Sequence, residues 1–327
     1  MLPFNMIRFL SSRLGPWPSA CAVVFFVTAS VAEPIKVVVS QKDGWDASVV
    51  ELGTRAGIFK DQGLDVELLF ASGGGEPIQA LISGSVDISV STGFLATLGA
   101  IAKGGPLEIV SSAFTGTSDV FWYVPTDSSI KSLADTPGRS VAFTGYGSSS
   151  QLILLSLLEQ NKIANVKTVA GGNPAAIQTA VMSGQIDVGF SLAPMNLRAV
   201  DEGKVRIVAR GGEVLAMKDQ TTRINVVSTR ALTEKPETIR RFMRGLNKSM
   251  DFMYGDERAL QWFGEMHKLT VEQTRRSRDT YHPRAAMQTG APKNLDLTIA
   301  QAKQYKYVPA DFSLEKLAPR MRLIDGQ

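Results

Sequence analysis

The sequence predicts an α/β protein made of two similar lobes. Two observations indicate this: short β-branched runs alternate with helical patterns along most of the chain, and one stretch of sequence recurs in the second half. Alternation of strands and helices is typical of βαβ units and mostly parallel sheets. The length of 327 residues fits about two domains at roughly 150 residues each.

The predicted strands are short runs rich in valine, isoleucine and leucine. They cover residues 35–40, 64–71, 86–91 and 107–113, and then 140–144, 166–170, 186–192, 205–209 and 224–228. Helices with a period near 3.6 residues lie between them, as in Leu152, Leu155 and Leu158. After the last strand, Pro236 opens a long amphipathic helix at a permitted early position, and the rest of the chain is mainly helical.

An internal repeat divides the chain. Residues 80–91 match residues 180–191 at an offset of 100, with five identical positions and five more that are apolar in both. Each copy contains a helix ended by Ser-Gly, an aspartate that leads into a buried strand, and a serine at the end of that strand. A glycine-rich turn precedes each copy. We therefore expect two lobes of similar construction.

The repeat suggests where the lobes begin and end. We expect residues 33–122 to form the first part of lobe I, residues 123–227 to form lobe II, and residues 228–327 to form a helical tail that returns to lobe I. The chain would then cross between the lobes near residues 121–125 and again near residues 224–229. Two such crossings make a two-strand hinge, which suits closure around a ligand.

The first 32 residues resemble a secretory signal peptide. Arg8 and Arg13 are their only charges, residues 20–29 form an apolar run, and Ser30-Val31-Ala32 is a small-residue cleavage site. The run is shorter than the roughly 20 apolar residues of a membrane span. We expect export with cleavage near Ala32, which lowers the formal charge from +4 to +2 because both arginines are lost.

Several kinds of chemistry are disfavoured. Cys21 is the single cysteine, so neither a disulfide framework nor a thiolate metal site is expected. No Gly-x-Ser-x-Gly elbow occurs. The stretch 145–150 lacks the third glycine and the following acid of a dinucleotide site, and Gly73-Gly74-Gly75 lacks the rest of a P-loop. We expect no cofactor, no metal and no catalytic residue. The two arginine clusters lie among acidic residues, so no nucleic-acid partner is expected either.

What remains is a set of loops at the carboxyl ends of strands, where α/β sheets bind ligands. These loops are rich in Gly, Ser and Thr and several open helices, a chemistry suited to a singly charged anion. Lys42 is their only cation, while Asp43, Asp46 and Glu76 are acidic. The candidate ligand-binding residues are Lys42, Trp45, Gly74, Gly75, Ser91, Thr92, Phe94, Tyr146, Ser148, Ser149, Ser150, Asn173 and Ser191. For each serine, helix capping or strand termination is the competing interpretation, and each aromatic residue either stacks on the organic part of the ligand or merely lines the hinge cleft.

The chain resembles periplasmic solute-binding proteins of the nitrate/sulfonate/taurine type, which serve ABC importers. The motifs that carry the resemblance are GIFKDQGLDVE (57–67), QALISGSVDI (79–88), AKGGPL (102–107), SLADTPGRSVA (132–142), GSSS (147–150) and SGQID (183–187). The resemblance covers residues 35–252. It implies the two-lobed type II periplasmic binding protein fold, a periplasmic location, a small organic anion as ligand and a membrane permease as partner. We expect a monomer.

Two departures from the family pattern affect the expected ligand. Glu76 places an acid beside the first glycine-rich turn, which disfavours nitrate, and the histidine- and cysteine-rich signatures of pyrimidine-precursor relatives are missing. A sulfonate, taurine or carboxylate ligand is therefore expected first. Two other functions stay open: an enzyme on the same fold, with Lys42, Asp43, Asp46 and Glu76 as its available acid and base groups, and a sensory protein that presents its ligand to a membrane receptor.

Overall fold

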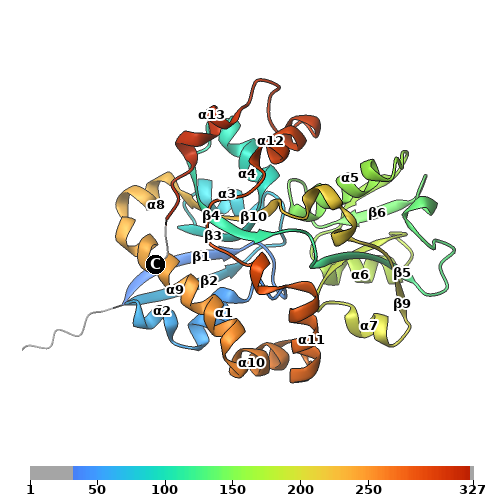
Figure 1. Cartoon of the computed structure of the whole chain (residues 1–327), viewed down its shortest axis with the longest axis horizontal. Helices are drawn as coiled ribbons and strands as arrows, with labels where there is room; N and C mark the ends of the chain where they lie inside the picture. The colour runs from blue at the N-terminus through green and yellow to red at the C-terminus, as the bar shows by residue number, and fades with distance from the viewer. Residues whose placement is uncertain (1–31, 325–327) are drawn as a thin grey trace, which may run out of the picture. The chain divides into compact units, whose positions relative to one another are not determined.

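The computed structural model describes residues 32–324, and the expected signal peptide at residues 1–32 therefore lies almost wholly outside the described residues. Within residues 32–324, ten strands and seven α-helices alternate as the sequence predicts, and six further α-helices follow the last strand (Figure 1). In the described part of the chain, no helix is both long enough and apolar enough to cross a membrane.

The first sheet has five strands in the order β2-β1-β3-β10-β4. Its members are β1 (Glu33–Val39), β2 (Leu64–Phe70), β3 (Ile88–Gly93), β4 (Leu107–Thr115) and β10 (Thr221–Ser228). β1 pairs in parallel with β2 and β3, whereas β10 is antiparallel to both of its neighbours. A strand from late in the chain thus lies inside a sheet built from the first third.

The second group of strands repeats this arrangement. It comprises β5 (Val120–Pro125), β6 (Ser140–Phe143), β7 (Lys167–Ala170), β8 (Gly189–Leu192) and β9 (Val205–Arg210). β6 pairs in parallel with β7, and a parallel bridge between Val141 and Val188 joins β6 to the start of β8. β5 is antiparallel to β8 and β9. The order β7-β6-β8-β5-β9 therefore reproduces the strand order of the first sheet, as the internal repeat predicts.

The observed strand pairing places the two connections between the sheets at other residues than the sequence predicted. Residues 121–125 belong to β5, which pairs along its length inside the second sheet, and residues 224–228 belong to β10 inside the first. The connections between the sheets are the preceding segments, residues 116–119 and 211–220. Both connections thus lie a few residues before the positions that the sequence predicted, because each strand begins directly after its connection. The division into two lobes stays a prediction, with its borders best placed in these segments.

The repeated aspartates hold the sheets together. The carboxylate of Asp87 accepts a hydrogen bond from the backbone N–H of Lys36 in β1 at 3.0 Å, and Asp187 accepts one from the backbone N–H of Ser140 in β6 at 2.8 Å. Gly84 and Gly184 both have φ +75°, as the predicted helix ends require. This part of the repeat is therefore structural.

The helices cover the sheets and form the tail. They are α1 (Val49–Arg55), α2 (Ile58–Asp61), α3 (Glu76–Ile82), α4 (Phe94–Ala102), α5 (Ser149–Gln160), α6 (Pro174–Met182), α7 (Leu197–Asp201), α8 (Thr229–Glu234), α9 (Pro236–Gly255), α10 (Glu257–His267), α11 (Val271–Tyr281), α12 (Leu295–Gln304) and α13 (Leu314–Leu317). α9 packs on α1 and α2, where Phe242 stacks on Phe59 with the ring centroids 5.1 Å apart. The tail also contacts the second sheet, since the Arg210 guanidinium at the end of β9 donates to the Tyr281 hydroxyl at 3.1 Å.

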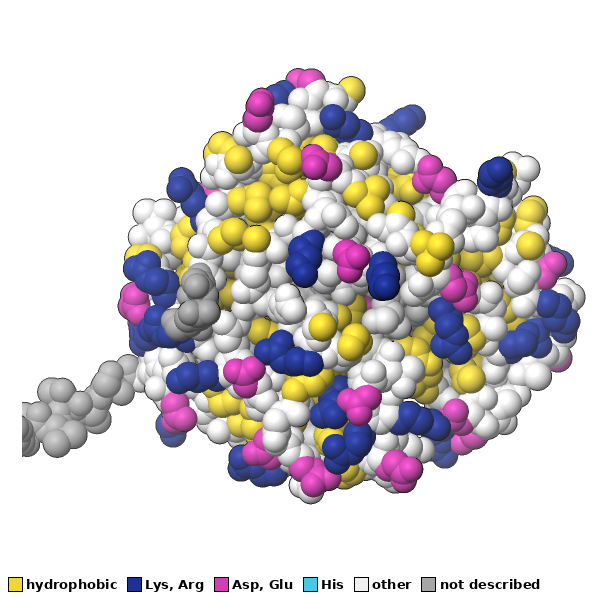
Figure 2. Space-filling model, in the orientation of Figure 1, with side chains coloured by type: hydrophobic (Ala, Val, Ile, Leu, Met, Phe, Trp, Pro, Cys, Tyr) yellow, Lys and Arg dark blue, Asp and Glu magenta, His cyan; other side chains and the backbone are white. Residues whose placement is uncertain are grey.

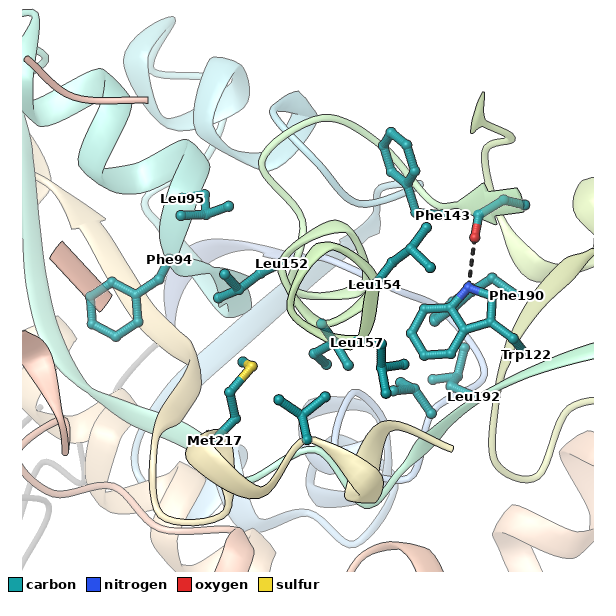
Figure 3. Close-up of a cluster of buried hydrophobic side chains, with 14 of the residues drawn as sticks. Phe94, Leu95, Trp122, Phe143, Leu152, Leu154, Leu157, Phe190, Leu192 and Met217 are labelled. Atoms are coloured by element: carbon teal, nitrogen blue, oxygen red, sulfur yellow. Dashed lines mark hydrogen bonds between the residues drawn. The ribbon is translucent and has the colours of Figure 1, made fainter. Parts of the chain in front are cut away.

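Two clusters of buried side chains form the core. The larger one extends from α4 across α5 to β5 and β8, where the Trp122 indole N–H donates to the carbonyl of Ala142 (Figure 3). The second lies between the first sheet and the tail helices α9 and α10. Phe94 belongs to the first cluster and Trp45 to the second.

The basic clusters of the tail are matched by acidic side chains. Arg240 and Arg244 pair with Glu237, and Arg241 pairs with Glu33. Arg275, Arg276 and Arg278 pair with Glu257, Asp201 and Asp279. On the face shown in Figure 2, basic and acidic side chains alternate without an extended area of one sign. These arginines therefore offer no basic stripe of the kind that binds nucleic acid.

Candidate ligand-binding cavity

A cavity lies where the loops at the carboxyl ends of both sheets meet. Residues of β3 and β10 with the loops after β1 and β2 form one wall, and the loop before α5 with residues of β5 and β8 forms the other. The lining residues are Ser40, Gln41, Asp46, Gly73, Gly74, Ser91, Gly93, Val120, Thr144, Ser148, Ser149, Ser150, Phe190, Leu192 and Arg223. The space open to the centre of a water molecule is about 30 Å³. That space holds only two or so water molecules.

Ser91 is held in place by polar contacts at the end of β3. Its φ of +58° lies in the left-handed region, which few non-glycine residues adopt. Its backbone N–H donates to the Asn225 side chain at 3.1 Å, and its hydroxyl donates to Asp46 Oδ2 at 2.5 Å. The strained backbone points the hydroxyl at a buried carboxylate of the cavity.

The opposite wall is the N-terminus of α5. Ser148 is the N-cap, and its hydroxyl accepts a hydrogen bond from the backbone N–H of Gln151. The Ser150 hydroxyl accepts from the backbone N–H of Thr144 at 3.0 Å and lies 2.9 Å from the Ser148 hydroxyl. Because α5 is 12 residues long, its dipole places partial positive charge at this end. Hydroxyls and helix dipole together favour an anion here.

Close contacts between glycines bring the walls together. A Cβ atom on Gly74 would lie 3.0 Å from the backbone of Gly145, and one on Gly93 would lie 2.8 Å from the carbonyl oxygen of Gly147. The backbone N–H of Ala96 also donates to that carbonyl at 3.1 Å. Only glycine permits backbones to approach this closely. The narrow cavity is therefore a consequence of glycines on both walls.

A buried charge cluster forms the floor of the cavity. Arg223 of β10 is 8% exposed; its Nη2 donates to Asp119 Oδ2 at 2.7 Å, and its Nε lies 3.4 Å from Asp46 Oδ2. The guanidinium also covers the ring of Phe114, 4.3 Å from its centroid. His282 of the tail places Nε2 3.9 Å from Asp46 Oδ1. Residues from four distant parts of the chain thus meet at one point.

The pKa shifts follow from burial and from these neighbours. Burial alone would raise the pKa of Asp46, but Arg223, His282 and the Ser91 hydroxyl outweigh burial and hold that pKa below its ordinary value. Burial opposes the charge of Arg223, yet Asp119 and Asp46 raise the pKa of the guanidinium. Burial lowers the pKa of His282, and Asp119 and Asp46 offset this only in part. Asp46 and Arg223 are charged at neutral pH, and His282 is neutral.

Asp46, Asp119 and His282 are the group among residues 32–324 whose donor atoms could surround a metal ion, since these atoms lie within 4.8 Å of one another. Arg223 already supplies a positive charge to both carboxylates. A metal ion would have to displace or approach that guanidinium, so the donor set fits an ion pair better than a metal centre.

The structure brings together only part of the predicted site. Gly74, Ser91, Ser148, Ser149 and Ser150 line the cavity. Thr92 lies directly beneath it, where its hydroxyl bonds to the hydroxyls of Ser40 and Ser89.

The other candidates lie elsewhere, in most cases because packing or capping uses the side chain. Trp45 is 1% exposed and packs edge-on against Phe263 at 5.0 Å. Phe94 is fully buried beside Leu95 and Leu152 (Figure 3). Asn173 caps α6, and the Ser191 hydroxyl donates to the carbonyl of Met195.

Three candidates lie near the surface. Lys42 is exposed and its ammonium lies over the ring of Phe70 at 5.3 Å. Tyr146 is 66% exposed, and both Tyr146 and Gly75 line a separate groove beside α3 and α4. Glu76, which was expected to influence the ligand, accepts a hydrogen bond from the backbone N–H of Ser72 at 2.8 Å and does not line the cavity. The acid of the cavity is Asp46.

Arg223 is the most important residue that the sequence reasoning missed. The loop inventory named Lys42 as the only cation because it covered only loops that follow strands. Arg223 instead stands inside β10, at the end of that strand nearest the crossing. The predicted strand began at residue 224, one position after Arg223, so no sequence signal placed this charge in the sheet.

Comparison with proteins of known sequence gives distant relatives of two kinds. A Brucella abortus protein that is named only as a binding protein is 24% identical over 236 residues, which cover 71% of each chain. A 4-amino-5-hydroxymethyl-2-methylpyrimidine phosphate synthase of Saccharomyces cerevisiae is 22% identical over 215 residues, covering 63% of this chain and 62% of the synthase.

Solved structures share the fold at low sequence identity. The alkanesulfonate-binding protein SsuA from Xanthomonas axonopodis pv. citri, bound to MOPS, superposes with a TM-score of 0.68 at 19% identity and covers 90% of this chain and 95% of that one. The nitrate-binding protein NrtA from Synechocystis PCC 6803 gives 0.67 at 14% identity and covers 90% of this chain and 86% of that one. The chain therefore has the periplasmic binding protein fold, as predicted.

The family follows from a direct match to a family model. The model described as NMT1/THI5 like matches residues 50–259, which is more than half of the chain. This segment contains the repeat, Ser91, Ser148 to Ser150 and Arg223. The protein belongs to the NMT1/THI5-like family.

Proposed function

We propose that this chain is the substrate-binding component of an ABC importer, which captures a small organic anion of the sulfonate or carboxylate type and delivers it to a membrane permease. The observation that carries the proposal is the pair of anion-binding groups in one cavity. Arg223 lies on one side, and the N-terminus of α5 with Ser148, Ser149 and Ser150 lies on the other.

These groups suffice for binding in the micromolar range. A hydrogen bond to a charged partner contributes roughly 1.5–3 kcal/mol, and micromolar affinity corresponds to about 8 kcal/mol. Three to five donors therefore meet the requirement. The guanidinium, the serine hydroxyls and the first backbone N–H groups of α5 provide that number.

The small volume of the cavity implies that the two walls must move apart before a ligand can enter. About 30 Å³ is too small for the carbon chain of an organic anion. The ligand would enter while the walls are apart, and its contacts to both walls would favour the closed arrangement. The apolar side chains of Phe190, Leu192 and Val120 on the lining would face the organic part of the ligand.

Location and partner are part of the same proposal. Proteins of known structure that share the fold include periplasmic sulfonate- and nitrate-binding proteins, and the first 32 residues have the pattern of a signal peptide. We expect a monomer in the periplasm that docks on an inner-membrane permease. A ligand-presenting sensory role uses the same cavity and differs only in the docking partner.

An enzyme is the second candidate, because synthases of a pyrimidine phosphate are among the relatives. Such chemistry needs an acid or base that reaches the ligand. Asp46 reaches the cavity, but its carboxylate is already engaged by the Ser91 hydroxyl and Arg223. His282 does not line the cavity. Binding without turnover is therefore the better-supported function.

The proposal is tested by thermal shift and calorimetry with ethanesulfonate, taurine, butanesulfonate, benzoate and nitrate as probes. A ligand that binds the native state raises the melting temperature. The double variant Ser149→Ala/Ser150→Ala is expected to weaken binding at least tenfold while the protein remains folded. The matched control is Ser83→Ala/Ser85→Ala, which removes two serines that bond to each other on the surface at 2.8 Å. Unchanged affinity in the first variant, or release of a chemically altered ligand, would contradict the proposal.

A further inference from the structure

His282 is buried behind Asp46, outside the cavity lining, and its ring makes no hydrogen bond among the described residues. It follows α11, its side chain is fully buried, and neither ring nitrogen has a hydrogen-bond partner among the described residues. The ring meets Phe114 edge-on at 5.8 Å, and the backbone carbonyl of His282 accepts from the Tyr254 hydroxyl at 2.5 Å. An unpaired buried polar group is costly, so its presence calls for a role.

The charges around His282 do not balance. Asp46 and Asp119 are carboxylates, and Arg223 is the one guanidinium that pairs with both. The cluster therefore carries one net negative charge while His282 is neutral. The Oδ1 atom of Asp119 is also buried without a partner. An anion entering the cavity beside Arg223 would add a second negative charge in a buried place.

Resting on the proposed function, we propose that His282 is the proton-accepting residue of this cavity and gains one proton when an anion binds beside Arg223. The proton comes from the bulk solution and binds the ring nitrogen that lacks one. No other bond forms or breaks. The imidazolium then faces Asp46 Oδ1, which is 3.9 Å from Nε2, and restores the charge balance of the loaded cavity.

Among the neighbouring groups, His282 is the residue whose protonation can change when an anion binds. Asp119 and Asp46 favour the protonated ring, whereas burial and Arg223 oppose it, and the net effect lowers the pKa of His282. A further negative charge acts in the same direction as the two carboxylates and moves the pKa upward. Burial raises the pKa of Tyr254, so its hydroxyl keeps its proton.

The inference is tested by titration calorimetry of the protein, expressed from its full-length sequence, with ethanesulfonate, benzoate and nitrate. Each titration is run at pH 7.5 in triethanolamine and in Tris, two amine buffers whose ionisation enthalpies differ and whose charged forms are cations, so that the difference in heat counts the protons bound. The wild type is expected to take up about one proton per anion. Its Kd is expected to rise up to about tenfold per pH unit above the unliganded pKa of His282.

The only other histidine of the chain provides the matched control. His267 lies at the end of α10, where its Nδ1 is 4.0 Å from Asp43 Oδ1, and its charged neighbours are Asp43 and Lys42 instead of Asp46, Asp119 and Arg223. His267→Asn should retain proton uptake and the pH dependence of Kd. His282→Asn should lose both and bind the anion more weakly at pH 6.5. An anion that binds the wild type without proton uptake overturns the inference and leaves the proposed function standing. Failure of all three anions to bind overturns both.

Histidine-ring NMR tests the same point on the wild type, should His282→Asn fail to fold. With two histidines, each ring signal is assigned by the His267→Asn spectrum. The His282 signal should report a neutral ring at pH 7.5 without anion and a protonated ring with the anion that binds in the calorimeter. A ring that stays neutral in the complex refutes the inference.

Discussion

Replacing Arg223 by methionine should destabilise the protein strongly, because Arg223 is the positive partner of two buried carboxylates. The guanidinium lies 2.7 Å from Asp119 and 3.4 Å from Asp46, and these side chains are 0% and 5% exposed. Removing one partner of a buried ion pair costs about 3–5 kcal/mol, because a buried charge is left uncompensated. For a chain of this size, each kcal/mol lowers Tm by roughly 2 °C, so a loss of about 6–10 °C is expected.

The pH dependence of that loss has a definite sign. In the wild type the pKa of Asp46 lies below its ordinary value. The stabilisation that this shift represents is therefore present at neutral pH and is lost as the pH falls through the folded-state pKa. In Arg223→Met, burial acts on Asp46 without the guanidinium and raises its pKa. Protonation then relieves the buried charge, so the stability deficit should narrow as the pH falls from 7 to 5.

The assay is urea unfolding of the wild type and of Arg223→Met at pH 7 and pH 5, followed by circular dichroism. Arg223→Lys is the control, because it keeps the charge but lacks the fork that reaches both carboxylates, and it should lose less than Arg223→Met. A deficit below about 1 kcal/mol at pH 7, or one that does not change between the two pH values, would refute the ion-pair argument.

Two further predictions concern the walls and the core. Gly93→Ala should weaken anion binding roughly 5- to 150-fold, because overpacking costs about 1–3 kcal/mol. The added Cβ would lie 2.8 Å from the carbonyl oxygen of Gly147. The control variant Gly75→Ala, whose Cβ would meet no atom within 4 Å, should bind the anion normally in the same calorimetric titration. Trp45→Ala should lower the free energy of unfolding by about 3–5 kcal/mol because the indole is core. If Trp45→Ala instead lowered the affinity for the anion with little loss of stability, Trp45 would be a ligand-binding residue and not a core residue.

The strands and the repeat could be predicted from sequence because their signals are local. The runs at 35–40 and 64–71 became β1 and β2 with ends displaced by one or two residues. The Ser-Gly helix ends and the matched aspartates occur in both halves as expected. A strand or a helix end is set by the dihedral preferences and the periodicity of a few neighbouring residues. The helix-opening serines of the cavity, Ser148 to Ser150, were found by the same reasoning.

By itself the sequence determined the α/β class, the duplicated strand and helix pattern, and the serine-rich wall of the cavity, because each depends on residues close together in the chain. The tertiary structure alone decided that Trp45 and Phe94 pack in cores, and that Arg223 and Asp46 lie in the cavity beside Asp119 and His282. Asp46 and His282 are separated by 236 positions in the sequence. Their contact exists because β10 returns to the first sheet and the tail folds back over it, and no local pattern encodes that return.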